Sequence, residues 1–152
     1  KATDGNYILT GESRSINGDV SNSKGGGDIW IVKFNASNGA IIWEQSYGGT
    51  EFDTSRGITK LENDYYAIAG SARSSDIDLT INYGANDAWL ILIDENGNLK
   101  FEKNVGGSDI DFANKTIGTN ENEIIVVGSS LSNDGDIIIN KGNKDILIFK
   151  IR

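Results

Sequence analysis

A motif that begins with aspartate and continues as an apolar strand occurs three times in this chain. Its copies are Asp28–Phe34 (DIWIVKF), Asp87–Ile93 (DAWLILI) and Asp145–Ile151 (DILIFKI), so the aspartates stand 59 and then 58 residues apart. A glycine recurs at the same step, at Gly11, Gly70 and Gly128. Periods of this size are typical of stacked repeats, such as solenoid coils or propeller blades.

The composition excludes several classes of active site within these 152 residues. The chain has no Cys and no His, which removes thiol nucleophiles, thiolate metal sites and the commonest general base. Serine triads, zinc hydrolases and Cys–His proteases are therefore excluded. The formal net charge of −8 argues against nucleic-acid backbones and anionic lipids as partners. No apolar run approaches the ~18 residues that span a bilayer, so we expect no direct membrane insertion.

The chain contains no Met, so we expect it to be a processed or trimmed piece of a longer protein. Each repeat is predicted to form four short strands, which in the first period are Tyr7–Gly11, Ile29–Phe34, Ile41–Tyr47 and Ser55–Leu61. Strands of this length separated by turn signals indicate an all-β protein. No segment has a sustained 3.6-residue apolar period, so we expect essentially no helix.

The repeated strand is apolar on both faces, because Ile29 and Ile31 alternate with Trp30, Val32 and Phe34. A strand of this kind must be covered on both sides. Sheets packed face to face around an axis provide that cover, whereas a single sandwich predicts strict alternation with one wet face. A solenoid coil predicts a shorter period with one strand per turn. We therefore predict β-propeller blades of four antiparallel strands.

Three segments in residues 7–53 carry a family resemblance: Tyr-Ile-Leu-Thr-Gly, Gly-Gly-Asp-Ile-Trp-Ile-Val-Lys-Phe-Asn and Tyr-Gly-Gly-Thr-Glu-Phe-Asp. Together they resemble the bacterial β-propeller repeat often called SBBP, which recurs in large secreted and cell-surface proteins, commonly of Bacteroidetes-type bacteria. The resemblance covers nearly the whole chain, with Leu147 in place of Trp and Val105 in place of Tyr as departures. It implies an extracellular or cell-surface location and transfers no catalytic residue.

The strand count predicts about two and two-thirds blades. A partial blade spans residues 1–54, a complete blade spans 55–112, and a second partial blade spans 113–152. Closed propellers typically have 4–8 blades, so we expect a partial propeller. The remaining blades would come from a longer form of the same chain or from sister chains.

The four-strand order places two kinds of loop on one rim: the long loops (12–27, 71–86 and 129–144) and the Gly-Gly loops (48–54 and 106–112). Propellers usually bind ligands on the rim with the long loops, so a protein or glycan of the cell surface is expected there. The candidate ligand-binding residues are Arg14, Asp19, Glu51, Asp53, Arg73, Asp76, Asp78, Asp109, Asp111, Asp134 and Asp136. The alternative for each is a solvated loop or a turn cap, since Asx side chains commonly bond their own backbone.

Two chemical alternatives involve these carboxylates. The segment Asn133–Asp136 (NDGD) is similar to the alternating oxygen ligands of calcium loops, but the longer EF-hand ligand run ending in Glu is absent. We expect no cofactor, with calcium as the alternative. The pairs Glu51/Asp53 and Asp109/Asp111 could imitate the two carboxylates of a glycosidase. The repeated aspartates are expected instead to be structural, accepting backbone N–H bonds or pairing with an adjacent blade.

We therefore expect a non-enzymatic interaction or adhesion scaffold, a fragment of a larger secreted or cell-surface protein. The alternatives are a carbohydrate-binding propeller, part of a polysaccharide-active enzyme whose catalytic residues lie elsewhere, and a purely structural spacer. Trp30, Trp43 and Trp89 lie inside predicted strands, which favours core packing over sugar stacking.

Overall fold

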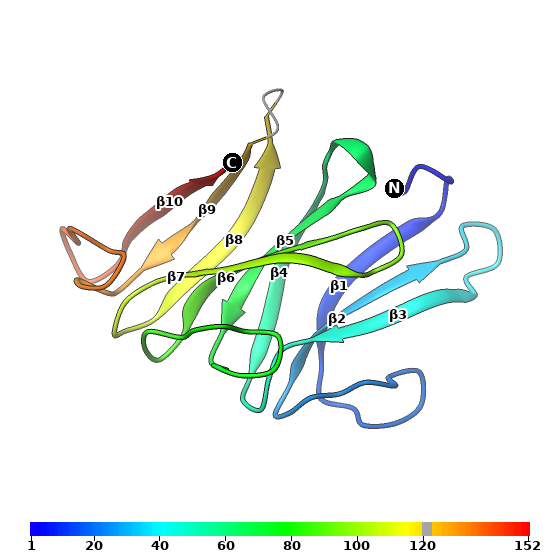
Figure 1. Cartoon of the computed structure of the whole chain (residues 1–152), viewed down its shortest axis with the longest axis horizontal. Coiled ribbons are helices and arrows are strands. Elements are labelled where there is room, and N and C mark those ends of the chain that lie inside the picture. The colour runs from blue at the N-terminus through cyan, green and yellow to red at the C-terminus, as the bar shows by residue number, and fades with distance from the viewer. Residues whose placement is uncertain (120–122) are drawn as a thin grey trace.

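The computed structural model describes residues 1–119 and 123–152, which form ten strands in three antiparallel sheets (Figure 1). The first sheet has the order β1-β2-β3, with β1 (Tyr7–Ser13), β2 (Asp28–Phe34) and β3 (Ile41–Tyr47). The second has the order β4-β5-β6-β7, with β4 (Asp53–Lys60), β5 (Tyr66–Ala72), β6 (Asp87–Ile93) and β7 (Leu99–Val105). The third has the order β10-β9-β8, with β8 (Asp111–Gly118), β9 (Ile124–Ser130) and β10 (Asp145–Ile151).

The prediction of an all-β protein is confirmed. The helical structure in the described ranges is a single 3-10 turn at Glu62–Asp64, and no helix there is long and apolar enough to cross a membrane. Every predicted strand of the first period is present, and the strand predicted from Ser55 begins two residues earlier, at Asp53. Each sheet is open, and its strands lie in chain order.

The three sheets stand side by side in chain order, from the first at the right of Figure 1 to the third at the left. Two apolar clusters fill the spaces between them. In the first cluster, Ile8, Ile29 and Ile31 of the first sheet meet Ile68 and Trp89 of the second. In the second, the opposite face of the second sheet meets the third sheet, through Ala67, Ala69, Leu90, Val126 and Leu147. Alternation of side chains along each strand directs neighbouring residues to opposite junctions.

The repeated apolar strand is covered on both faces only in the middle of this stack. In β6, Trp89 and Leu90 are both fully buried. In β2, Ile29 and Ile31 are fully buried, but Trp30 on the other face is half-buried. The reason is that the second sheet has a neighbour on each side, whereas the first has one.

The repeated glycine of the second strand is explained by a bulge in the strand beside it. In β4 the register shifts between Ser55 and Gly57, and a Cβ added to Gly70 of β5 would lie 2.0 Å from the carbonyl oxygen of Thr54. Gly128 is related to β8 in the same way, with 1.7 Å to the carbonyl oxygen of Phe112. Gly11 occupies the equivalent place in β1, where a Cβ would meet no atom within 4 Å.

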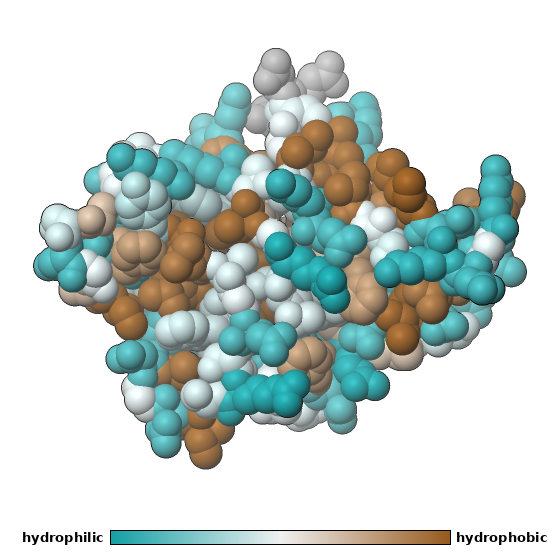
Figure 2. Space-filling view, turned by 180° about the vertical axis from the view of Figure 1, so that it is seen from behind, coloured by the Kyte–Doolittle hydropathy of each residue, from teal (hydrophilic) through white to brown (hydrophobic). Residues whose placement is uncertain are grey.

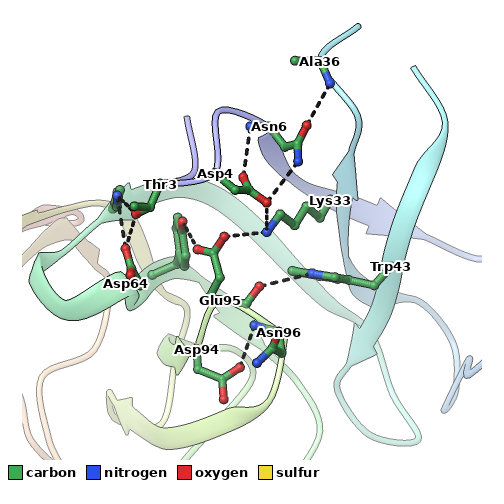
Figure 3. A network of polar contacts seen from close by, with 12 residues as sticks. Thr3, Asp4, Asn6, Lys33, Ala36, Trp43, Asp64, Asp94, Glu95 and Asn96 are labelled. Carbon is green, nitrogen blue, oxygen red and sulfur yellow. Dashed lines mark hydrogen bonds and ion pairs between the residues drawn. The ribbon is translucent and has the colours of Figure 1, made fainter. Parts of the chain in front are cut away.

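A buried lysine ties the first sheet to the second at the rim of tight turns, which lies opposite the long loops and includes the turns at 35–39 and 94–98 (Figure 3). Lys33 Nζ lies 2.8 Å from Asp4 Oδ2 and 2.5 Å from Glu95 Oε1, and the Tyr66 hydroxyl donates to Glu95 Oε2 at 2.7 Å. Burial opposes the charge on Lys33, but its hydrogen bonds to Asp4 and Glu95 outweigh burial and raise its pKa. Trp43 donates its Nε1–H to the backbone carbonyl of Glu95 at 3.2 Å, closing the network.

Candidate functional site

The long loops and the Gly-Gly loops lie against each other on one rim, as the strand order predicts. In the first repeat, the Gly26 N–H donates to the Thr50 carbonyl at 3.1 Å, and the Asp53 N–H donates to the Gly27 carbonyl at 2.8 Å. In the second repeat, the Asp111 N–H donates to the Asn86 carbonyl at 2.7 Å. In these two repeats, the end of the long loop is therefore joined to the following Gly-Gly loop by an isolated parallel β-bridge.

A second set of hydrogen bonds joins each Gly-Gly loop to the long loop of the following repeat. The Thr50 N–H donates to Asp76 Oδ1 at 2.9 Å, and the Glu51 N–H donates to Ser74 Oγ at 3.0 Å. The next junction repeats both bonds, from Ser108 N–H to Asp134 Oδ1 at 2.7 Å and from Asp109 N–H to Ser132 Oγ at 3.0 Å. The same polar contacts thus hold the loops of neighbouring repeats together at both junctions between sheets.

The aspartate after each Gly-Gly pair sits at the centre of this arrangement. Asp53 is fully buried and accepts four bonds: from Gly49 N–H at 2.9 Å, Arg73 N–H at 3.0 Å, Ser74 N–H at 3.2 Å and Ser74 Oγ–H at 2.7 Å. Burial raises the pKa of Asp53, although these bonds oppose the increase. Asp111 accepts two bonds, from Gly107 N–H at 2.9 Å and from the Ser132 hydroxyl at 2.7 Å.

The first glycine of each Gly-Gly pair is flanked by two buried carboxylates. A Cβ at Gly48 would lie 2.7 Å from both Asp28 Oδ1 and Asp53 Oδ2. A Cβ at Gly106 would lie 2.6 Å from Asp87 Oδ1 and 2.7 Å from Asp111 Oδ2. The two repeated aspartates therefore meet at this glycine, which explains physically why the motifs Asp-x-Trp and Gly-Gly-x-x-x-Asp occur together.

Asp87 is the carboxyl group whose protonation this crowding changes most clearly. Burial raises its pKa to about 6, with the negative charges of Asp111 and Asp136 acting in the same direction against the N–H bond from Tyr83. A folded-state pKa above the unfolded value means that the folded protein binds more protons than the unfolded chain between pH ~4 and ~6. This contribution to stability is therefore fully present below pH ~4 and is lost as the pH rises through ~6.

We expect Asp87→Asn to remove this pH dependence. The asparagine keeps an oxygen for the Tyr83 N–H and carries no charge, so the loss of about 2 kcal/mol that Asp87 contributes between pH 4 and 6.5 should disappear. Urea unfolding midpoints across this pH range provide the measurement. Asp19→Asn is the control, because it removes the same charge from an exposed loop side chain. Parallel pH profiles for wild type and Asp87→Asn would contradict the assignment.

The candidate residues on the rim differ in how far their side chains are exposed to solvent. Asp53 and Asp111 are buried, Asp76 and Asp78 are half-buried, and Arg14, Asp19, Glu51, Arg73, Asp109, Asp134 and Asp136 are exposed. In each suggested glycosidase pair, one carboxylate is therefore exposed and the other is enclosed by loop backbone. A role of these residues in ligand binding stays a prediction.

Several of the same residues already have partners within the chain. The Arg14 guanidinium lies over the Phe52 ring, 4.9 Å from its centroid, and Asp78 forms an ion pair with Lys24. The Asp136 N–H donates to the Gly106 carbonyl at 2.8 Å, so the NDGD segment is bound to the neighbouring Gly-Gly loop. Within residues 1–119 and 123–152, no group of three or more His, Cys, Asp or Glu side chains is arranged to hold a metal ion.

The sequence analysis did not predict a role for Ser74 and Ser132, which complete the hydrogen bonds between neighbouring loops. Ser74 and Ser132 are almost fully buried, and each hydroxyl donates to a central aspartate while accepting the N–H of the preceding repeat's loop. The signal was available, because these serines are 58 residues apart, the same step as the other markers.

Two apolar grooves lie away from this rim. One, of about 750 Å³, opens at the rim of tight turns and is lined by Leu61, Tyr65, Phe101, Ile117 and Ile151 among others. The other, of about 530 Å³, lies on the outer face of the first sheet, with Leu9, Trp30, Val32, Phe34 and Ile41 in its lining.

Comparison with protein-family models gives no match to this chain, and comparison with curated proteins gives none of significance.

Proposed function

We propose that this chain is an arc of a β-propeller that serves as a non-enzymatic interaction or adhesion scaffold of a secreted or cell-surface bacterial protein. The observation that carries the proposal is the recurrence of one set of loop-locking hydrogen bonds at both junctions. Catalytic groups rarely recur with every repeat, whereas contacts that hold a repeat array together must recur. The SBBP-type motifs support a location outside the cell.

The locked loops would act as a rigid platform. Their backbone is held by buried Asp53 and Asp111, and the exposed rim side chains project from it. Arg14 and Arg73 are the exposed cations among the candidate residues and occupy equivalent places in successive repeats. A rigid surface that presents equivalent cations one repeat apart, beside exposed carboxylates such as Asp109 and Asp134, suits a repetitive glycan or protein of the cell surface that can hydrogen-bond to both kinds of side chain.

The proposal is tested by applying fluorescently labelled chain to intact bacterial cells and to an array of neutral and charged glycans. We expect saturable retention, and we expect Arg14→Ala/Arg73→Ala to weaken it at least ~5-fold through loss of charge-assisted hydrogen bonds. The control Lys60→Ala/Lys100→Ala removes the same charge from exposed sites elsewhere. Equal weakening by both double variants would contradict a specific rim site. Cleavage of the glycan, detected by mass spectrometry, would contradict a non-enzymatic role.

A further inference from the structure

Both ends of the row of sheets present exposed apolar side chains. On the outer face of the first sheet, Leu9 is 58% and Tyr7 42% exposed, and on that of the third sheet Ile146 is 79% and Ile148 64% exposed. Figure 2 shows hydrophobic surface on both the left and the right half of the molecule. Apolar faces of this kind mark interaction surfaces in soluble proteins.

The outer face of the first sheet repeats the face with which the second sheet covers the first. Tyr7 and Trp30 stand one repeat before Tyr66 and Trp89, which are buried in that junction. Aliphatic or aromatic residues fill the other equivalent places, with Leu9, Val32 and Phe34 corresponding to Ile68, Ile91 and Ile93. The first sheet therefore presents outward one half of a junction that the protein already contains.

The outer face of the third sheet repeats the other half of that same junction. The first sheet meets the second through Ile8, Ile29 and Ile31, with Lys33 at the rim. At the corresponding positions the third sheet has Ile125, Ile146, Ile148 and Lys150, identical residues in the same order. The second sheet differs, with Ala67, Ala88, Leu90 and Leu92 there, so this match is closest between the first and third sheets.

We propose that a second copy of this chain covers both faces. The third sheet of each copy packs on the first sheet of the other, reproducing the junction between the first and second sheets. The contact is heterologous, and two such contacts close a ring of six sheets, within the range of about 4–8 for propellers, whereas three copies would supply nine. This inference rests on the propeller arrangement in the proposed function, but it does not depend on what the loop rim binds.

The charges at the faces permit this contact. Lys33 is paired across the existing junction with Glu95, and the residue equivalent to Glu95 on the first sheet is Ala36, which cannot pair with Lys150. Lys150 Nζ lies instead 3.0 Å from Oε1 of Glu123, which immediately precedes β9 of the same sheet. Covering the third sheet therefore does not bury an unpaired charge.

The mass of the chain in solution tests the proposal, by light scattering after gel filtration from about 1 to about 100 µM. The wild type is expected at twice the 16.4 kDa of one chain. Leu9→Glu and Ile146→Lys each place a charge in both junctions of the ring, so each variant alone should associate at least about 100-fold more weakly and run at 16.4 kDa. An equimolar mixture should return to the dimer mass, because that pair retains one unaltered junction.

Ile138→Lys is the control, since Ile138 is 89% exposed in the loop between β9 and β10, outside both faces, and it should stay dimeric. Far-UV circular dichroism verifies that all variants keep the β fold. A monomeric wild type, or a mass that grows beyond two copies, would overturn the ring. Loss of association in only one of the two face variants would indicate a symmetric face-to-itself contact and overturn the head-to-tail pairing. Failure of cell or glycan binding by an intact dimer would concern the proposed function alone.

Discussion

Gly70→Ala is expected to destabilise the protein by on the order of 3 kcal/mol or more, enough to unfold a large fraction of a marginally stable domain. A Cβ at this position would lie 2.0 Å from the carbonyl oxygen of Thr54 and 3.0 Å from the Cα of Ser55. Both atoms belong to the backbone of β4, at its bulge, so no side-chain rotation relieves the clash. The strand would have to move, and with it the apolar contacts on both faces of the second sheet.

Gly11→Ala is a matched control for this prediction, because Gly11 has the same place in β1 and a Cβ there would meet nothing within 4 Å. This variant should be neutral or more stable by about 0.5 kcal/mol, since alanine is favoured over glycine within a strand. Urea denaturation followed by tryptophan fluorescence gives both midpoints. Equal losses in the two variants would mean that glycine is required at this position for a reason other than the bulged strand.

The fold was predictable from sequence to the extent that it depends on local pattern and period. The copies Asp28–Phe34 and Asp87–Ile93 revealed the repeat, and their apolar character on both faces predicted sheets packed against sheets. This prediction assumed that every copy of the strand has a sheet packed against both of its faces. In the structure Trp89 is fully buried and Trp30 is not, because coverage depends on the number of neighbouring sheets and not on the strand's own sequence.

The polar architecture of the loop rim was less predictable. Asp28 and Asp53 are 25 positions apart, and only the packing of two irregular loops brings both carboxylates to Gly48. The burial of Lys33 was also not predictable, because a lysine near the end of an apolar strand normally extends into solvent. Its burial depends on Asp4 and Glu95, which come from two different turns. The repeat period marks such positions, but in a single sequence it does not show which of them are in contact or which of them are buried.

Asp53→Ala is expected to open the rim of the first junction and to lower stability by on the order of 3 kcal/mol. The change leaves the Gly49 N–H and both donors of Ser74 without their acceptor in a buried setting, and each such group costs about 1–3 kcal/mol. The Arg73 N–H suffers less, because it also donates to the Phe52 carbonyl at 3.2 Å. Removing a buried charge offsets part of the loss, since burial raises the pKa of Asp53.

Two comparisons separate this mechanism from a general loss of packing. Asp111→Ala removes the acceptor of only two donors, Gly107 N–H and the Ser132 hydroxyl, so it should cost less than Asp53→Ala. Asp53→Asn keeps the oxygen that accepts the Arg73 and Ser74 N–H groups but turns an amide toward the Gly49 N–H, so its stability should be intermediate. Hydrogen exchange should accelerate at the amides of residues 49–51 and 73–74 in Asp53→Ala, with little change in β6. Uniform acceleration through β6 would show instead that the aspartate supports the whole sheet stack and that the loop rim has no stability of its own.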